Sequence, residues 1–119
     1  MSGTVALDEL ARRVAEHGPV AFLVTTGTDA RSHVVSVAVS FDGETFAFAA
    51  GTTSTANVEA NPAATLLWPG TGGPYALIVD GRARRGDDGL VLDPTRAVLH
   101  RLAGASADLP SCVRIEPDA

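Results

Sequence analysis

The dipeptide Asp42-Gly43 separates two segments in which apolar residues alternate with small or polar ones. In the first segment, one face of a strand would carry five side chains: His33, Val35, Val37, Val39 and Phe41. The opposite face would carry mostly small side chains: Val34, Ser36, Ala38 and Ser40. Because Asp-Gly between alternating segments is a strong signal for a two-residue hairpin turn, we expect antiparallel strands on both sides of it. The fold should therefore be built on an antiparallel sheet.

Further strands and helices are expected along the rest of the chain. Apolar or alternating segments predict strands at residues 20–26, 32–41, 44–50, 63–68, 75–85, 90–92 and 111–117. Helices are predicted at residues 4–17, within residues 51–61 before Pro62, and from the N-cap signal Asp93-Pro94 to about Gly104. The expected fold class is mainly β with peripheral helices, an antiparallel barrel forming a single domain over residues 1–119.

Composition excludes several classes of function. Hydrophobic residues make up 45% of the 119 residues and charged residues 19%, which is typical of a compact globular domain. The net charge is −5 and all nine basic residues are arginine, so we expect no nucleic-acid partner. No apolar run is long enough to span a membrane, and no secretory signal is recognisable, so a cytoplasmic location is expected. A chain this short is expected to need a second subunit to complete a small-molecule site.

The sequence contains no recognisable catalytic or metal-binding motif. His17, His33 and His100 lie far apart, so no metal site is predicted; His17 is interpreted as a residue at a helix C-terminus and His100 as a helix surface residue. The neighbours of Cys112 are typical of a packed thiol, and no serine lies in a nucleophile elbow. No catalytic residue is assigned. A domain without its own catalytic groups either binds something or takes its chemistry from a cofactor.

Several segments in a fixed order resemble a known family. The chain has an N-terminal helix ending at Gly18, then "AFLVTTGTDARSHVVSVAVSFDGETFAFAAGTTSTANVEANPAATLLW", then "YALIVDGRAR". Together they are similar to the pyridoxamine 5'-phosphate oxidase-like FMN-binding split barrels, part of the flavin and deazaflavin oxidoreductase superfamily common in actinobacteria. The resemblance covers residues 5–116.

This resemblance implies a homodimer with FMN or a deazaflavin coenzyme in a groove at the interface. Backbone groups near Val35, Ser36 and Val37 would face the polar edge of the flavin ring. The segment from Ala50 into the helix would meet the phosphate through N–H groups at the helix N-terminus. The residues implied in this contact are Thr52, Thr53, Ser54, Thr55 and Asn57.

The same segment departs from the family pattern because residues 51–62 contain no lysine or arginine. Family members that bind FMN usually carry a basic residue at the position of Ser54, and others at the positions of Thr52 and Ala56. Losing two charge-assisted contacts to a phosphate would cost several kcal/mol unless other groups replace them. Arg31 or an arginine of the partner chain is the expected replacement. The alternative is that "TTST" only caps a helix while Asn57 packs against the sheet.

Trp68 and Tyr75 flank the loop "PGTGGP" and are predicted either to stack on a flavin or substrate or to anchor the dimer interface.

The leading hypothesis is an FMN- or deazaflavin-dependent oxidoreductase that transfers hydride to or from a small molecule. The first alternative is a non-enzymatic split-barrel dimer that has lost the cofactor or binds another small ligand in the groove. The second is a barrel that only mediates assembly.

Overall fold

The computed structural model describes residues 5–117. Two helices and seven strands follow one another along this part of the chain. They are α1 (Leu7–His17), β1 (Val20–Thr26), β2 (Ser32–Phe41), β3 (Phe46–Phe48), α2 (Thr52–Ala60), β4 (Ala63–Trp68), β5 (Tyr75–Arg85), β6 (Leu90–Arg101) and β7 (Cys112–Arg114). Helix α1 therefore agrees with the helix predicted at residues 4–17, whose first residue lies outside the described range.

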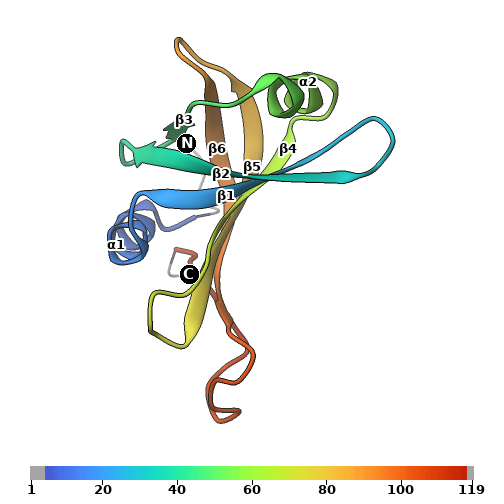
Figure 1. Ribbon diagram of the computed structural model, residues 1–119. Helices are drawn as coiled ribbons and strands as arrows, with labels where there is room; N and C mark the ends of the chain where they lie inside the picture. The colour runs from blue at the N-terminus through green and yellow to red at the C-terminus, as the bar shows by residue number, and fades with distance from the viewer. Residues whose placement is uncertain (1–4, 118–119) are drawn as a thin grey trace.

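The strands form one antiparallel sheet that closes into a barrel (Figure 1). Their order is β3-β2-β1-β4-β5-β6-β7, and β3 also pairs with β6, which joins the ends of the first six strands into a ring. Strand β6 is long enough to pair with β3 near Leu92 and with β7 near Leu99 on the same edge. The predicted fold class, mainly β with peripheral helices, is confirmed.

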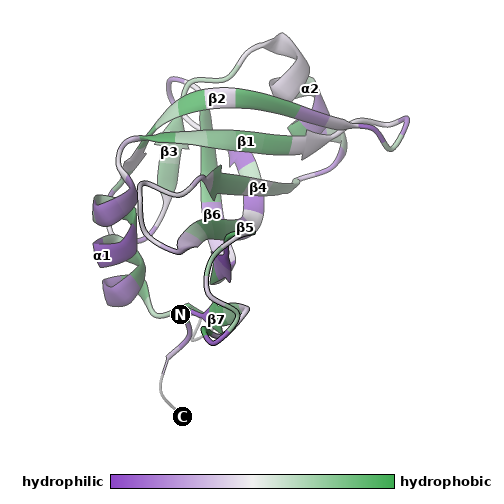
Figure 2. Cartoon of the chain, turned by 60° about the horizontal axis from the view of Figure 1, so that its bottom comes forward, coloured by the Kyte–Doolittle hydropathy of each residue, from purple (hydrophilic) through white to green (hydrophobic). Residues whose placement is uncertain are grey.

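Alternate residues of the strands point into the barrel and form its core. Trp68 and Phe46 are fully buried there, with ring centroids 5.5 Å apart, and the indole Nε1 of Trp68 donates a hydrogen bond to the Gly18 carbonyl at 3.0 Å. Helix α1 adds the fully buried Leu10 to this core. Figure 2 shows the predominantly hydrophobic strands β1, β2 and β4 beside the largely hydrophilic α1. Burial of this apolar surface is the main stabilising contribution.

Helix α2 lies against the barrel at one end of β1. The Asn57 amide Nδ2 donates to the Oγ1 of the fully buried Thr25 at 3.1 Å, and Val58 is buried in the core. The helix ends at Ala60 because Asn61 has an extended backbone and Pro62 follows it. This anchoring determines where the N-terminus of α2 points.

The helix predicted from Asp93 to about Gly104 is wrong, because this segment belongs to β6. The Asp93-Pro94 pair lies at a β-bulge opposite Gly81, where the register with β5 shifts. Proline is tolerated at a bulge because no ladder N–H is needed there. Gly81 permits the close approach, since a Cβ at this position would clash with the Asp93 carbonyl. Long-range pairing with β5 thus overrides the local capping signal.

The hairpin loop after β2 has four residues instead of the predicted two. Phe41 pairs with Phe46, so residues 42–45 form the loop. The Asp42 carboxylate Oδ1 accepts hydrogen bonds from the backbone N–H groups of Glu44 and Thr45, each at 2.8 Å. This local capping favours the longer loop. The strands predicted at residues 44–50 and 111–117 are correspondingly shorter, as β3 and β7.

Within residues 5–117, neither helix has the length and hydropathy needed to cross a membrane.

Candidate functional site

A groove of about 380 Å³ runs between β2 and the N-terminus of α2. We call it the α2 groove. Its lining residues are His33, Val35, Ser36, Val37, Ala49, Ala50, Gly51, Thr52, Thr53 and Ser54. Two segments of the sequence, residues 33–37 of β2 and residues 49–54 at the start of α2, therefore form one concavity. Its volume lies within the range of small-molecule sites.

One wall of the groove is an unpaired strand edge. Strand β2 pairs with β1 from Ser32 to Ala38, but pairs with β3 only from Val39 onward. The Val39 N–H donates to the Pro19 carbonyl on the β1 side at 2.7 Å. Because successive residues of a strand direct their backbone groups to opposite sides, the N–H and C=O of Ser36 point away from β1 toward the groove. These groups are placed to hydrogen-bond with a ligand.

The opposite end of the groove is the N-terminus of α2. The first intrahelical bond joins the Thr55 N–H to the Gly51 carbonyl at 3.0 Å, so the N–H groups of Thr52, Thr53 and Ser54 have no helical acceptor. Ser54 exposes only 1% of its surface, and its hydroxyl forms no hydrogen bond with another residue of the described range. The helix dipole adds partial positive charge here. The donor set is therefore suited to an anion.

His33 is the only ionisable residue that lines the groove. Sequence reasoning assigned it no role, although the alternation of β2 placed it on the same face as Val35 and Val37. No lysine or arginine is among the lining residues. The sequence lacks a basic residue at Ser54, where family members usually have one. The structure shows that no other residue of the groove lining supplies a lysine or arginine in its place.

Two other predicted site residues lie near the groove without lining it. Thr55 directs its hydroxyl to the Gly51 carbonyl at 2.9 Å, and Asn57 binds Thr25 as described above. The Thr55 bond is internal to the first turn of α2, whereas the Asn57 bond holds α2 against β1. Arg31 lies in the turn before β2, with 88% of its side chain exposed and its Nε 3.8 Å from Asp29. Arg31 is not among the residues that line the groove, so its contact with a ligand phosphate stays a prediction.

Trp68 is not available to a ligand or a partner chain, because it is fully buried in the core of its own subunit. The prediction for this residue is therefore wrong, and the core contact with Phe46 is the reason. Tyr75 is half-buried, and its hydroxyl donates to the Pro110 carbonyl at 2.8 Å. It lies at the start of β5, next to α1 through the contact between His17 Nε2 and the Tyr75 carbonyl. An interface role for Tyr75 stays a prediction.

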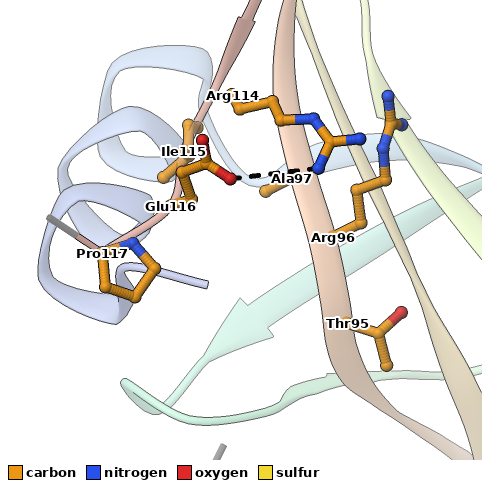
Figure 3. Close-up of a pocket in the computed structure, with 7 residues that line it drawn as sticks. All are labelled: Thr95, Arg96, Ala97, Arg114, Ile115, Glu116 and Pro117. Carbon is orange, nitrogen blue, oxygen red and sulfur yellow. Dashed lines mark ion pairs between the residues drawn. The ribbon is translucent and has the colours of Figure 1, made fainter. Parts of the chain in front are cut away.

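A second cavity, of about 300 Å³, lies beside β6 and β7 (Figure 3). Arg96 and Arg114 both line it, but each is paired with a carboxylate. Arg96 Nη1 lies 3.2 Å from Asp80 Oδ2, and Arg114 Nη1 lies 3.9 Å from Glu116 Oε2. The positive charges are thus largely compensated, and we assign no function to this cavity.

The remaining chemistry-bearing side chains do not assemble into a site. Cys112 is exposed, in contrast to the packed thiol that its neighbours indicated. His100 is exposed on β6 and not on a helix, whereas His17 is at the end of α1 as predicted. No group of three His, Cys, Asp or Glu residues that could hold a metal ion occurs in the described range.

Residues 7–117 match the family model described as pyridoxamine 5'-phosphate oxidase. The chain belongs to this family. No curated protein matches its sequence. The barrel closed by β3 and β6 is thus the split barrel of the pyridoxamine 5'-phosphate oxidase family, and the resemblance noted in the sequence is confirmed.

Solved structures show the same fold at low sequence identity. A Clostridium acetobutylicum protein related to general stress protein 26 of B. subtilis, of the pyridoxinephosphate oxidase family, is 12% identical, with 92% of this chain and 93% of that chain covered and a TM-score of 0.68. A Listeria innocua protein provisionally assigned as a pyridoxamine 5'-phosphate oxidase is 19% identical, with coverages of 78% and 97% and a TM-score of 0.63. HupZ of Group A Streptococcus is 14% identical, with coverages of 84% and 97% and a TM-score of 0.64.

Membership of this family supports a flavin-binding split-barrel fold. The α2 groove of this chain fits a phosphate monoester at one end, where free N–H groups and the Ser54 hydroxyl converge. Its other wall offers backbone groups of β2 to a polar ring edge. The groove lining supplies binding and orientation but no pair of groups for acid–base or nucleophilic chemistry.

Proposed function

We propose that this protein is an FMN- or deazaflavin-dependent oxidoreductase that binds its coenzyme in the α2 groove and transfers hydride to or from a small organic molecule. The observation that carries the proposal is the arrangement across one groove of two complementary binding elements. These are the free edge of β2 at Ser36 and the free N–H groups at the start of α2. The cytoplasmic location expected from the sequence stays a prediction.

The two elements would hold different parts of the coenzyme. The N–H groups of Thr52, Thr53 and Ser54 and the Ser54 hydroxyl would bind the phosphate, with Ala50 and Gly51 forming the approach to it. The Ser36 backbone would hydrogen-bond to the polar edge of the ring. Val35 and Val37 would provide apolar contact and exclude water from the ring on that side.

When bound, the coenzyme supplies the hydride chemistry, and the chain supplies binding and orientation. Orientation of two reactants in one site can lower a barrier substantially without any protein acid or base. The absence of an acid–base pair from the groove lining therefore agrees with this class of reaction.

A homodimer would complete the site. Six large apolar residues of four adjacent strands form an outer apolar face: Val20, Phe22, Val24, Val34, Leu67 and Ile78. Val20, Phe22 and Val34 are 53%, 38% and 56% exposed, which is high for large hydrophobic side chains. Ser36 pairs with Phe22 and also lines the α2 groove, so the face and the groove adjoin. A second copy on this face would cover the groove, in keeping with a family whose members are typically dimeric.

One observation favours a second candidate function. No lysine or arginine lines the groove, so a ligand with two negative charges would meet no permanently charged partner there. The second candidate is a non-enzymatic split-barrel dimer that has lost the coenzyme or binds a less charged small ligand there.

Coenzyme binding separates the two candidates. The purified protein should be examined for flavin absorbance as isolated and then titrated with FMN and with the deazaflavin coenzyme, using fluorescence quenching. Saturable binding at low micromolar concentration would support the oxidoreductase. No binding of either coenzyme at high concentration would leave the second candidate.

An added charge tests whether the groove is the binding site. Ser54 itself is buried, so arginine is better introduced at the neighbouring exposed position, as Thr53→Arg. This variant should tighten FMN binding about tenfold through one charge-assisted contact. The matched control, Ala60→Arg, adds the same charge at the other end of α2 and should have little effect. Equal effects of the two variants would indicate general electrostatic attraction.

A further inference from the structure

His33 is the one side chain lining the α2 groove that can carry a positive charge. We propose that protonated His33 is a binding partner of the ligand's anionic group, so that anion binding in the groove strengthens as the pH falls below neutrality. The proposal rests on the function proposed above in taking the ligand to be a phosphate monoester. It assigns to histidine the role that lysine or arginine would otherwise have.

The anion end of the groove is a built site. Ser54 is 1% exposed, lines the groove, and has a hydroxyl without a hydrogen-bond partner in the described range. The Ser54 hydroxyl can therefore hydrogen-bond with a ligand in the groove. His33 lines the same concavity from β2, opposite Thr25 of β1. The imidazole and the α2 donors thus border the same space.

No carboxylate of the groove lining would neutralise a protonated His33. Strand β1, which pairs with β2 at this position, contains no ionisable residue, and neither does the connection from Ala49 to Gly51. On α2 the only ionisable residue is Glu59, whose Oε2 is 2.7 Å from Arg85 Nε. The closest charges along the chain are Asp29 and Arg31, which are exposed and lie 3.8 Å from each other. The charge of His33 is therefore available to a ligand.

The dependence on pH has a definite sign. An anion that binds protonated imidazole more tightly than neutral imidazole gains affinity as the pH falls, until the ring is fully protonated. A phosphate monoester complicates the measurement, because it gains its own second proton near pH 6. Sulfate keeps its charge throughout this range and therefore isolates the contribution of the histidine.

The experiment uses two probes on the full chain between pH 5.5 and pH 8. Sulfate binding is followed by the NMR resonances of the His33 ring, and FMN binding by fluorescence quenching. We expect sulfate affinity to rise about tenfold from pH 8 to pH 5.5. The variant His33→Gln should abolish the rise, whereas the control His100→Gln, on the exposed part of β6, should retain it. The variant His33→Arg, with a permanent charge, should bind sulfate tightly at every pH.

The outcomes separate this inference from the proposed function. Sulfate binding that depends on pH and on His33, without FMN binding, would support the anion site and contradict the flavin enzyme. FMN binding with no effect of His33→Gln or His33→Arg on either probe would support the enzyme and overturn the role of His33. Loss of folding in His33→Gln would leave His33→Arg as the deciding variant, because an unchanged pH dependence in that variant also overturns the proposal.

Discussion

At the scale of single residues, Asn57 links α2 to the barrel and so maintains the groove. Its amide donates to Thr25, a polar residue of β1 that is fully buried. A buried hydroxyl needs such a partner, since leaving it unsatisfied costs free energy. Asn57 thus has a structural role, and Ser54, three residues earlier on α2, lies in the groove lining.

Replacing Asn57 tests this role. Asn57→Ala should lower the free energy of unfolding by about 1–2 kcal/mol, because the Thr25 hydroxyl loses its partner. Urea denaturation followed by circular dichroism measures the change. The control Glu59→Gln, which breaks an exposed ion pair on the same helix, should change stability by less than about 0.5 kcal/mol. Equal values for both variants would show that the bond to Thr25 contributes little.

Asp42 provides a test by pH. Backbone hydrogen bonds from Thr45 and Glu44 hold the pKa of its carboxyl below the usual value of 3.8. A lowered pKa in the folded state stabilises the protein above that usual value, and the stabilisation is lost as the pH falls through the folded-state value. Asp42→Asn should therefore melt below the wild type at pH 6 and approach it at pH 2. Melting curves across this range would contradict the assignment if the difference stayed constant.

At the scale of elements, β6 joins the parts of the fold. It pairs with β5 over eleven residue pairs and with β3 and β7 on its other edge. The bulge at Asp80 and Gly81 accommodates Pro94 within this strand. Thr65 and Arg96 both bind the Asp80 carboxylate, at 2.6 and 3.2 Å, and so connect β4, β5 and β6 across the bulge.

A methyl group at the bulge should disturb this strand. Gly81→Ala would bring a Cβ against the Asp93 carbonyl, so we expect a loss of about 1–3 kcal/mol in the free energy of unfolding. Gly73→Ala is the matched control, because a Cβ there meets nothing within 4 Å. Chemical denaturation of both variants gives the comparison. A loss of similar size at Gly73 would mean that the clash is not responsible.

The elements differ in how far the sequence predicts them. Strand β2 and the end of helix α2 follow from signals within their own residues: alternation in β2, and Asn61-Pro62 after α2. Strand β6 does not, because its Asp93-Pro94 pair is a helix-start signal locally and becomes a bulge only through pairing with Gly81. Similarly, a tryptophan at the end of a strand and beside a loop looks like a surface anchor, and only the closed barrel buries Trp68. The family resemblance predicted that the backbone near Ser36 faces the ligand. The place of His33 in the groove lining could be recognised only once the structure showed the groove.

At the scale of the whole molecule, the outer apolar face predicts association. Val34→Asp places a charge in this face and should convert a dimer into a monomer, measured by sedimentation equilibrium. Ala103→Asp, at an exposed loop position, adds the same charge and should leave the dimer intact. A wild-type protein that is monomeric at all concentrations would contradict the proposed assembly.

The barrel is closed by a very short strand. Only three residue pairs, from Phe46–Leu92 to Phe48–Leu90, join β3 to β6, and β3 continues directly into Ala49 and the groove. Local openings of a native protein occur where few contacts are lost, so this seam should be the part of the ring whose amides exchange with deuterium first. A ligand held at the start of α2 restrains the same segment. Ligand binding should therefore slow deuterium uptake at the β3–β6 seam, residues 46–48 and 90–92, although the ligand itself lies on the other side of β3.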